Sequence, residues 1–143
     1  MSHPDLAPPV VLLVEDDPGD VLMTREGLPT TDVRVVDDGE AAIDFLRHHG
    51  RFHDAPRPDL VLLDLNLPRI DGLEVLGTIK RDATLRSIPV VVLTTSDAED
   101  DVARSYNLHA NAYVTKPVDF KAFAAILQEI HDFFLQVVRL PRS

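Results

Sequence analysis

Short apolar runs alternate with helical patterns along the chain, and this alternation limits the possible folds more than any other feature. The apolar runs are residues 10–14, 33–36, 60–63, 89–93 and 112–115. The run at 10–14 is too short for a helix and rich in β-branched residues, and uninterrupted apolar runs of this kind are typical of strands buried on both faces. Five such strands in strict alternation with five helices predict an α/β fold, a doubly wound five-stranded parallel sheet with right-handed crossovers.

The predicted helices begin at recognisable capping residues. Four begin at an aspartate, whose carboxylate can accept the free N–H groups of a first turn: Asp17, Asp38, Asp71 and Asp119. The fourth helix in chain order begins instead at Ser96, which with Glu99 matches a capping box. Residues 48–58 are polar and contain two prolines and a glycine, so they are predicted to form a surface loop.

The length of 143 residues fits one domain. We expect a flexible segment at 1–9, the folded domain at 10–132 and a C-terminal extension at 133–143.

A net charge of −10 disfavours binding to nucleic acid or to an anionic membrane. The first residues lack a signal sequence, and no stretch approaches the roughly 18 apolar residues of a membrane span. The absence of cysteine excludes disulfides and thiolate chemistry. We expect a cytoplasmic protein.

Polar side chains follow four of the five predicted strands. Glu15, Asp16 and Asp17 follow the first, Asp64 the third, Thr94 the fourth and Lys116 the fifth. Ligands of open α/β sheets bind at the carboxyl ends of the strands, where these side chains converge if the first and third strands are neighbours.

Clustered carboxylates repel one another, and a hard cation such as Mg²⁺ relieves the repulsion. One carboxylate could then attack phosphorus while the metal and Lys116 neutralise the phosphoryl oxygens. Taken singly, the acids could be helix caps, Thr94 a strand residue and Lys116 a surface lysine. Only their joint placement favours a site.

Six features of the chain carry a family resemblance. They are residues 13–17 (LVEDD), 62–66 (LLDLN), 67–72 (LPRIDG) and 89–94 (PVVVLT), with Tyr113 and Lys116-Pro117. In this order and spacing the chain resembles the receiver domain of two-component response regulators. The resemblance implies a flavodoxin-like fold with strand order 2-1-3-4-5 and an extended C-terminal helix.

The resemblance also implies roles for the acidic residues. Asp64 would be the phosphoacceptor, receiving a phosphoryl group from a histidine kinase. Asp16 would bind Mg²⁺ directly with Glu15 assisting, and the backbone carbonyl of Asn66 would be a further ligand.

Three other positions match the switch and phosphoryl-binding positions of the family. Thr94 would be the switch hydroxyl, Lys116 would contact the phosphoryl oxygens, and the ring of Tyr113 would move inward on activation. The Lys116–Pro117 peptide bond would be cis, as it often is in the family. Such a protein is not an enzyme with a separate substrate but a phosphoacceptor that assists its own phosphotransfer and slow dephosphorylation.

A subgroup resembles the chain more closely still. Residues 93–101 and 105–109, the loop at 48–58 and the aromatic tail at 133–141 are similar to stand-alone receivers paired with bacterial and cyanobacterial phytochromes. The implied partner is the histidine kinase module of a photoreceptor. Too few residues follow about position 130 for an output domain, so we expect output through a partner.

The last predicted helix carries a broad apolar stripe. The residues that recur at helical spacing are Phe120, Phe123, Ala124, Leu127, Ile130, Phe134 and Val138. Three more apolar residues widen the stripe: Ile126, Phe133 and Val137. The resemblance implies a homodimer through the fourth helix, fifth strand and fifth helix, together with the C-terminal tail. The alternative is a longer helix that folds back on its own core.

Other readings are weaker. A haloacid-dehalogenase-type phosphatase needs a second acid two residues after the nucleophile, where this chain has Asn66. A flavin or dinucleotide site needs a glycine-rich loop after the first strand, where acids stand instead. A dimerisation module without phosphorylation gains no support, since every expected side chain is present. His48, His49 and His53 are interpreted as solvated surface residues rather than metal ligands.

Overall fold

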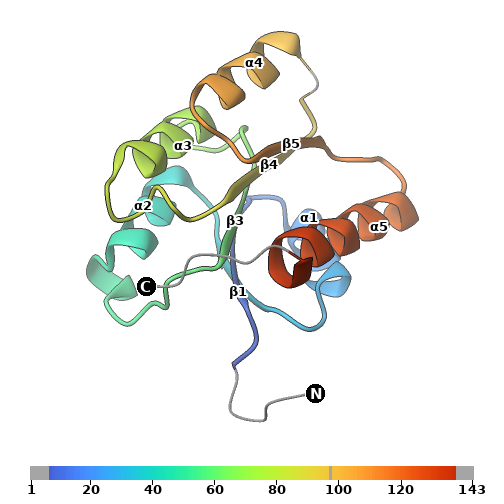
Figure 1. Ribbon diagram of the computed structural model, residues 1–143, viewed down its shortest axis with the longest axis horizontal. Helices are drawn as coiled ribbons and strands as arrows, with labels where there is room; N and C mark the ends of the chain where they lie inside the picture. The colour runs from blue at the N-terminus through green and yellow to red at the C-terminus, as the bar shows by residue number, and fades with distance from the viewer. Residues whose placement is uncertain (1–6, 97, 138–143) are drawn as a thin grey trace.

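Five parallel strands form one sheet in the part of the chain that the computed structural model describes, residues 7–96 and 98–137 (Figure 1). They are β1 (Val10–Val14), β2 (Asp32–Val36), β3 (Leu60–Leu63), β4 (Val90–Thr94) and β5 (Ala112–Thr115). Their order is β2-β1-β3-β4-β5, and every neighbouring pair is parallel. The predicted fold class and strand order are confirmed.

Helices cover both faces of the sheet. They are α1 (Pro18–Gly27), α2 (Gly39–Arg47), α3 (Gly72–Arg81), α4 (Glu99–Asn107) and α5 (Phe120–His131). In Figure 1, α1 and α5 lie together on one side of the sheet and α2 and α3 on the other, with α4 beside β5. The predicted extension of the last helix is present, because α5 continues into a π-helical segment, Asp132–Val137.

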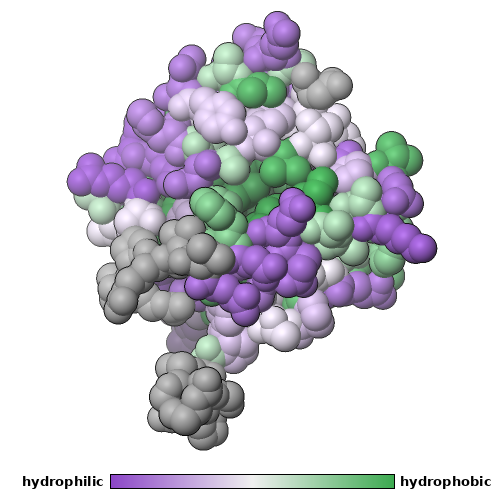
Figure 2. Space-filling view, turned by 45° about the vertical axis from the view of Figure 1, so that its right-hand side comes forward, coloured by the Kyte–Doolittle hydropathy of each residue, from purple (hydrophilic) through white to green (hydrophobic). Residues whose placement is uncertain are grey.

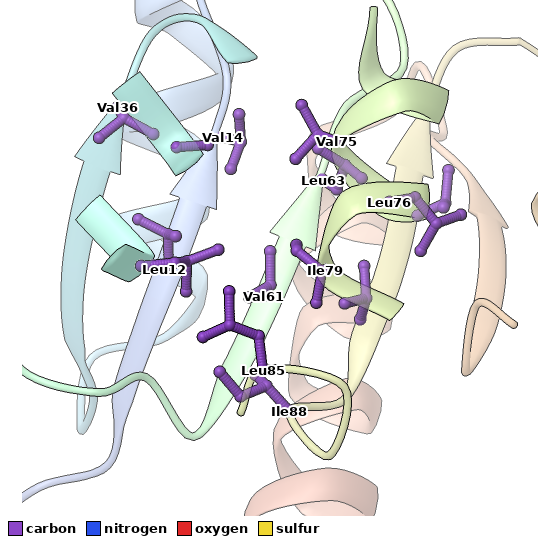
Figure 3. Packing of buried hydrophobic residues seen from close by; sticks show 14 of the residues in the cluster. Leu12, Val14, Val36, Val61, Leu63, Val75, Leu76, Ile79, Leu85 and Ile88 are labelled. Atoms are coloured by element: carbon purple, nitrogen blue, oxygen red, sulfur yellow. The ribbon is translucent and has the colours of Figure 1, made fainter. Parts of the chain in front are cut away.

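The central strands are apolar throughout because each face meets a helix layer. Along β1, Val11 and Leu13 pack in the cluster beneath α5, whereas Leu12 and Val14 pack in the cluster beneath α2 and α3. Figure 3 shows the second cluster, in which Val61 and Leu63 of β3 meet Val75, Leu76 and Ile79 of α3. Burial on both faces explains why the strand sequences lack polar alternation.

The four aspartate caps are confirmed. Their carboxylates accept backbone N–H groups of the first turn: Asp17 from Gly19 and Asp20, Asp38 from Ala41, Asp71 from Leu73, and Asp119 from Ala122.

Two local predictions are wrong. Helix α4 begins at Glu99 with Ala98 as its N-cap residue, and no side chain caps it. Ser96 lies before the helix because its hydroxyl donates to Asp101 Oδ2 at 2.6 Å and its carbonyl accepts the Tyr113 hydroxyl at 2.7 Å. Every peptide bond in the described part of the chain is trans, including Lys116–Pro117, so the expected cis bond is not found.

The segment 48–58 is a surface connection, as predicted, with one short 3₁₀ turn at Gly50–Phe52. The Arg57 side chain links this segment to the α3–β4 connection, because its guanidinium donates a hydrogen bond to the Thr84 carbonyl at 2.7 Å. Within residues 7–96 and 98–137, no helix combines the length and apolar character needed to cross a bilayer. Residues 1–6 and 138–143 of the predicted terminal segments lie outside the described residues.

Candidate functional site

The sheet brings the predicted site residues to one edge. The ladder of hydrogen bonds continues past the strand ends: the Glu15 N–H donates to the Val36 carbonyl and the Asp64 N–H donates to the Val14 carbonyl. The Lys116 N–H likewise donates to the Thr94 carbonyl at 2.7 Å. Because β1 and β3 are neighbours, Glu15 and Asp64 lie side by side, which satisfies the condition set from the sequence.

Three carboxylates form a group that fits a divalent cation. Glu15, Asp16 and Asp64 each offer an oxygen, and these oxygens lie within 4.8 Å of one another. Glu15 and Asp64 are buried, whereas Asp16 is exposed, so the group opens to solvent on one side. Oxygen donors with room for water suit Mg²⁺. Among the described residues this is the only cluster of three such groups, and His48, His49 and His53 are exposed and lie outside it.

Lys116 joins this group from β5. Its side chain is buried, and its ammonium donates to Glu15 Oε1, to Asp20 Oδ2 at 2.8 Å and to Asp64 Oδ2 at 3.4 Å. An ammonium has three N–H donors, so these three carboxylates account for all of them.

Asp20 is absent from the residues predicted for this site. It lies in the first turn of α1, directly after the strand-end acids, and its side chain is about one-fifth exposed (21%). An acid in a first turn is normally explained by the helix dipole alone. Its place beside the predicted acids, at the carboxyl end of β1, is the signal that could have identified it.

Burial and charge perturb the two central groups. Burial raises the pKa of Glu15 to about 7, against the opposing hydrogen bond and charge of Lys116, and the charge of Asp64 adds to the rise. Burial disfavours the Lys116 ammonium, but its hydrogen bonds to Asp20 and Glu15 outweigh this and hold its pKa above the ordinary value. One ammonium therefore leaves the acids incompletely neutralised, and a cation would favour ionised Glu15.

The β3–α3 connection fixes the backbone behind Asp64. The exposed Asn66 donates its N–H to Asp64 Oδ1 at 3.2 Å. Gly72 lies so close that a Cβ at this position would come within 2.5 Å of the Asp64 carbonyl oxygen. A glycine is therefore required for the backbone of α3 to approach the end of β3.

Thr94 and Tyr113 both reach the segment that leads into α4. The buried Thr94 accepts the Ser96 N–H at its hydroxyl, at 3.4 Å. The half-buried Tyr113 donates its hydroxyl to the Ser96 carbonyl and its N–H to the Tyr106 hydroxyl at 3.1 Å. Ser96 thus connects the two residues.

Comparisons with known proteins agree with this geometry. The family model for the response regulator receiver domain matches residues 11–128. The chain is 47% identical to the response regulator Rcp1 of Synechocystis, with 100% of both chains covered.

Two solved structures are similar over nearly the whole chain. The phosphorylated cyanobacterial phytochrome response regulator RcpA has a TM-score of 0.93 and 45% identity, with 95% of this chain and 100% of that chain covered. The Mn²⁺-bound form of Rcp1 has a TM-score of 0.90 and 47% identity, with 94% of this chain and 100% of that chain covered.

Proposed function

This chain belongs to the response regulator receiver domain family, whose members are phosphoacceptors, and we propose that it accepts a phosphoryl group on Asp64 with Mg²⁺ at the adjacent acids. The observation that carries the proposal is the meeting of Asp64 with Lys116 and two further acids at one edge of the sheet. The phosphorylated and Mn²⁺-bound states of its two relatives support it.

Asp64 is the nucleophile in this proposal. One of its carboxylate oxygens forms a bond to the phosphorus of a phosphohistidine, the phosphorus–nitrogen bond breaks, and its electron pair returns to the imidazole. Lys116 donates hydrogen bonds to the phosphoryl oxygens as negative charge shifts among them.

The metal would be held by the carboxylates of Glu15, Asp16 and Asp64 and by the backbone carbonyl of Asn66. Bound there, Mg²⁺ supplies positive charge beside the phosphoryl oxygens. The protein is then not an enzyme acting on a separate substrate. It is a phosphoacceptor that assists its own phosphotransfer and its slow dephosphorylation.

Phosphorylation would be transmitted through Ser96. The Thr94 hydroxyl turns toward the phosphoryl group and gives up the Ser96 N–H, while the Tyr113 ring moves inward and gives up the Ser96 carbonyl. Both changes alter the connection to α4. The new charge at Asp64 thus shifts the population between two arrangements of this face.

The upstream partner in this proposal is a histidine kinase linked to a phytochrome, and the protein acts in the cytoplasm. Support comes from RcpA, which is described as a phytochrome response regulator. The surplus of acids disfavours nucleic acid as a partner.

The face formed by α4, β5 and α5, with the C-terminal tail, would form a homodimer. Figure 2 shows hydrophobic residues gathered in a hollow between α4 and α5. Half-buried apolar side chains of this region include Ala112 and Val114 of β5 and Ile126 of α5. Phe133, just after α5, is 56% exposed. Apolar surface of this kind is typical of an interface.

The test of phosphoacceptance is intact mass after incubation with acetyl phosphate and Mg²⁺. We expect one phosphoryl group on the wild-type chain, and none on Asp64→Asn or in EDTA. Rapid hydrolysis could remove the phosphoryl group before its mass is measured. Binding of beryllofluoride is therefore measured in parallel, with a change in the surroundings of the Tyr113 ring as the signal. A wild-type chain that gains neither the adduct nor beryllofluoride would contradict the proposal.

A further inference from the structure

We propose that Asp20 is a positioning residue that holds the Lys116 ammonium on the α1 side of the site, away from Asp64, until a phosphoryl group arrives. The inference rests on the proposed role of Asp64 as phosphoacceptor. It assigns to a residue of α1 the control of how strongly Lys116 engages that acceptor.

The distances carry this inference. The Lys116 Nζ lies 2.8 Å from Asp20 Oδ2 but 3.4 Å from Asp64 Oδ2. Charge-assisted N–H···O bonds are about 2.7–2.9 Å long, so the contact with Asp20 is a full bond and the contact with Asp64 is a weak one. In the resting protein, Lys116 therefore bonds mainly to Glu15 and Asp20.

Asp20 is held in place independently of Lys116. Its N–H donates to the Asp17 carboxylate, and its carbonyl accepts the Thr24 hydroxyl at 2.7 Å. Helix α1 packs against α5. Asp20 is not one of the three grouped carboxylates, Glu15, Asp16 and Asp64, and its side chain contacts the Lys116 ammonium.

Phosphoryl transfer changes the set of hydrogen-bond acceptors around the Lys116 ammonium. The phosphoryl group adds strong acceptor oxygens beside an ammonium that has full bonds to Glu15 and Asp20 and one weak contact, with Asp64. To donate more than one hydrogen bond to the phosphoryl oxygens, Lys116 must release Glu15 or Asp20. Glu15 is buried, whereas the Asp20 side chain is partly exposed and can be rehydrated when it is released. Asp20 is therefore the partner that Lys116 gives up, and it competes with the phosphoryl group for one hydrogen bond.

Asp20→Asn tests this competition, since the amide keeps the shape of the side chain and removes its charge. In the full chain with Mg²⁺, we expect it to bind beryllofluoride about 5–10-fold more tightly than wild type, the size of one ordinary net hydrogen bond. An affinity within two-fold of wild type, or a weaker one, would overturn the inference.

A double variant distinguishes two effects of Asp20: positioning of the Lys116 ammonium, and direct repulsion of the beryllofluoride anion by the Asp20 carboxylate. If Asp20 acts through Lys116, adding Asp20→Asn to Lys116→Met produces no gain in beryllofluoride affinity over Lys116→Met alone. An equal gain in both backgrounds would mean that Asp20 acts by its long-range charge, and the positioning role would be wrong.

A direct readout does not depend on phosphoacceptance. In the metal-free protein with ¹⁵N-labelled lysine, Asp20→Asn should shift the Lys116 Nζ resonance and speed exchange of its protons with water. An unchanged resonance would overturn the inference even if wild type binds beryllofluoride normally. A wild type that gains neither the phosphoryl adduct nor beryllofluoride, while Asp20→Asn still shifts the resonance, would contradict only the proposed function.

Discussion

At the scale of single residues, burial decides which charges need a partner. Glu15 and Lys116 are both buried, and each would be costly to leave without the other. Asp16 and Asp20 are reached by solvent and bear less of this cost. The site therefore has a fixed buried pair and two acids whose partners can change.

The pH dependence of stability should reveal Glu15 in the metal-free protein. Folded Glu15 keeps its proton up to about pH 7, whereas in the unfolded chain it ionises near its ordinary pKa of 4.5. The folded state thus binds more protons in this window, so stability falls as pH rises from 4.5 to 7. In EDTA, the free energy of unfolding of wild type should fall by about 1–2 kcal/mol relative to Glu15→Gln between pH 5 and 8.

Urea unfolding at several pH values measures this difference. Mg²⁺ should reduce the fall, because a cation favours the ionised carboxylate. Parallel pH profiles of wild type and Glu15→Gln in EDTA would contradict the prediction.

Lys80 offers a stability prediction away from the site. Its half-buried ammonium donates to the Arg86 carbonyl at 3.1 Å, the Ile88 carbonyl at 2.8 Å and Asn111 Oδ1 at 2.9 Å. These acceptors precede β4 and β5, at the opposite end of the strands from Asp64. Lys80→Met should lower the free energy of unfolding by about 1–3 kcal/mol, because it leaves the Arg86 and Ile88 carbonyls without this donor, although Asn111 Oδ1 still accepts the Val90 N–H.

Phosphorylation by acetyl phosphate should stay normal in folded Lys80→Met. Thermal unfolding and intact mass on the same sample measure both properties. A loss of phosphorylation without a loss of stability would show that Lys80 has a role at the site instead.

The sequence predicted which side chains meet at one edge of the sheet where a strand delivers them. Asp64 and Lys116 directly follow strands, so the parallel sheet alone brings them to one edge. Asp20 lies in a helix, and its direction depends on how α1 rotates against α5. That rotation is set by tertiary packing, so the position of Asp20 beside the strand-end acids made it a candidate but could not show that its side chain reaches Lys116.

At the scale of elements, the connection between β3 and α3 should tolerate substitution poorly. A Cβ at Gly72 would come within 2.5 Å of the Asp64 carbonyl oxygen and 2.6 Å of the Leu65 Cα. Both are backbone atoms, so the strand end itself must move. We expect Gly72→Ala to cost about 1–3 kcal/mol of stability and to slow phosphorylation at Asp64.

Gly19→Ala is the matched control, because its Cβ would meet only the Asp17 Oδ1 atom at 3.3 Å, the end of a flexible side chain. Urea unfolding and the rate of phosphorylation should change little in this variant. Equal effects of the two substitutions would contradict the argument from backbone contact.

Helix starts were predictable where the capping contact is local. Asp17, Asp38, Asp71 and Asp119 each accept N–H groups two or three residues ahead, as their sequence spacing indicates. Ser96 failed as a cap because its carbonyl is held by Tyr113, seventeen residues away. A long-range contact therefore displaced the beginning of α4, at the connection proposed to transmit the switch.

At the scale of the whole molecule, apolar area and net charge act against each other in the proposed dimer. A charge of −10 on each chain disfavours association, and the repulsion weakens as salt screens it. Association driven by the apolar face of α4, β5 and α5 should therefore strengthen from low to moderate salt. A dimer held by ion pairs would weaken over the same range.

Phe133 and Leu22 make a matched pair for this test, because they are similarly exposed, at 56% and 59%, but lie after α5 and on α1 respectively. Phe133→Ser should weaken dimerisation about ten-fold or more, the loss expected from one large interface side chain, whereas Leu22→Ser should leave it unchanged. Sedimentation equilibrium over a range of protein and salt concentrations, with and without beryllofluoride, measures both. A chain that stays monomeric in every condition, or equal losses in the two variants, would place the interface elsewhere or exclude it.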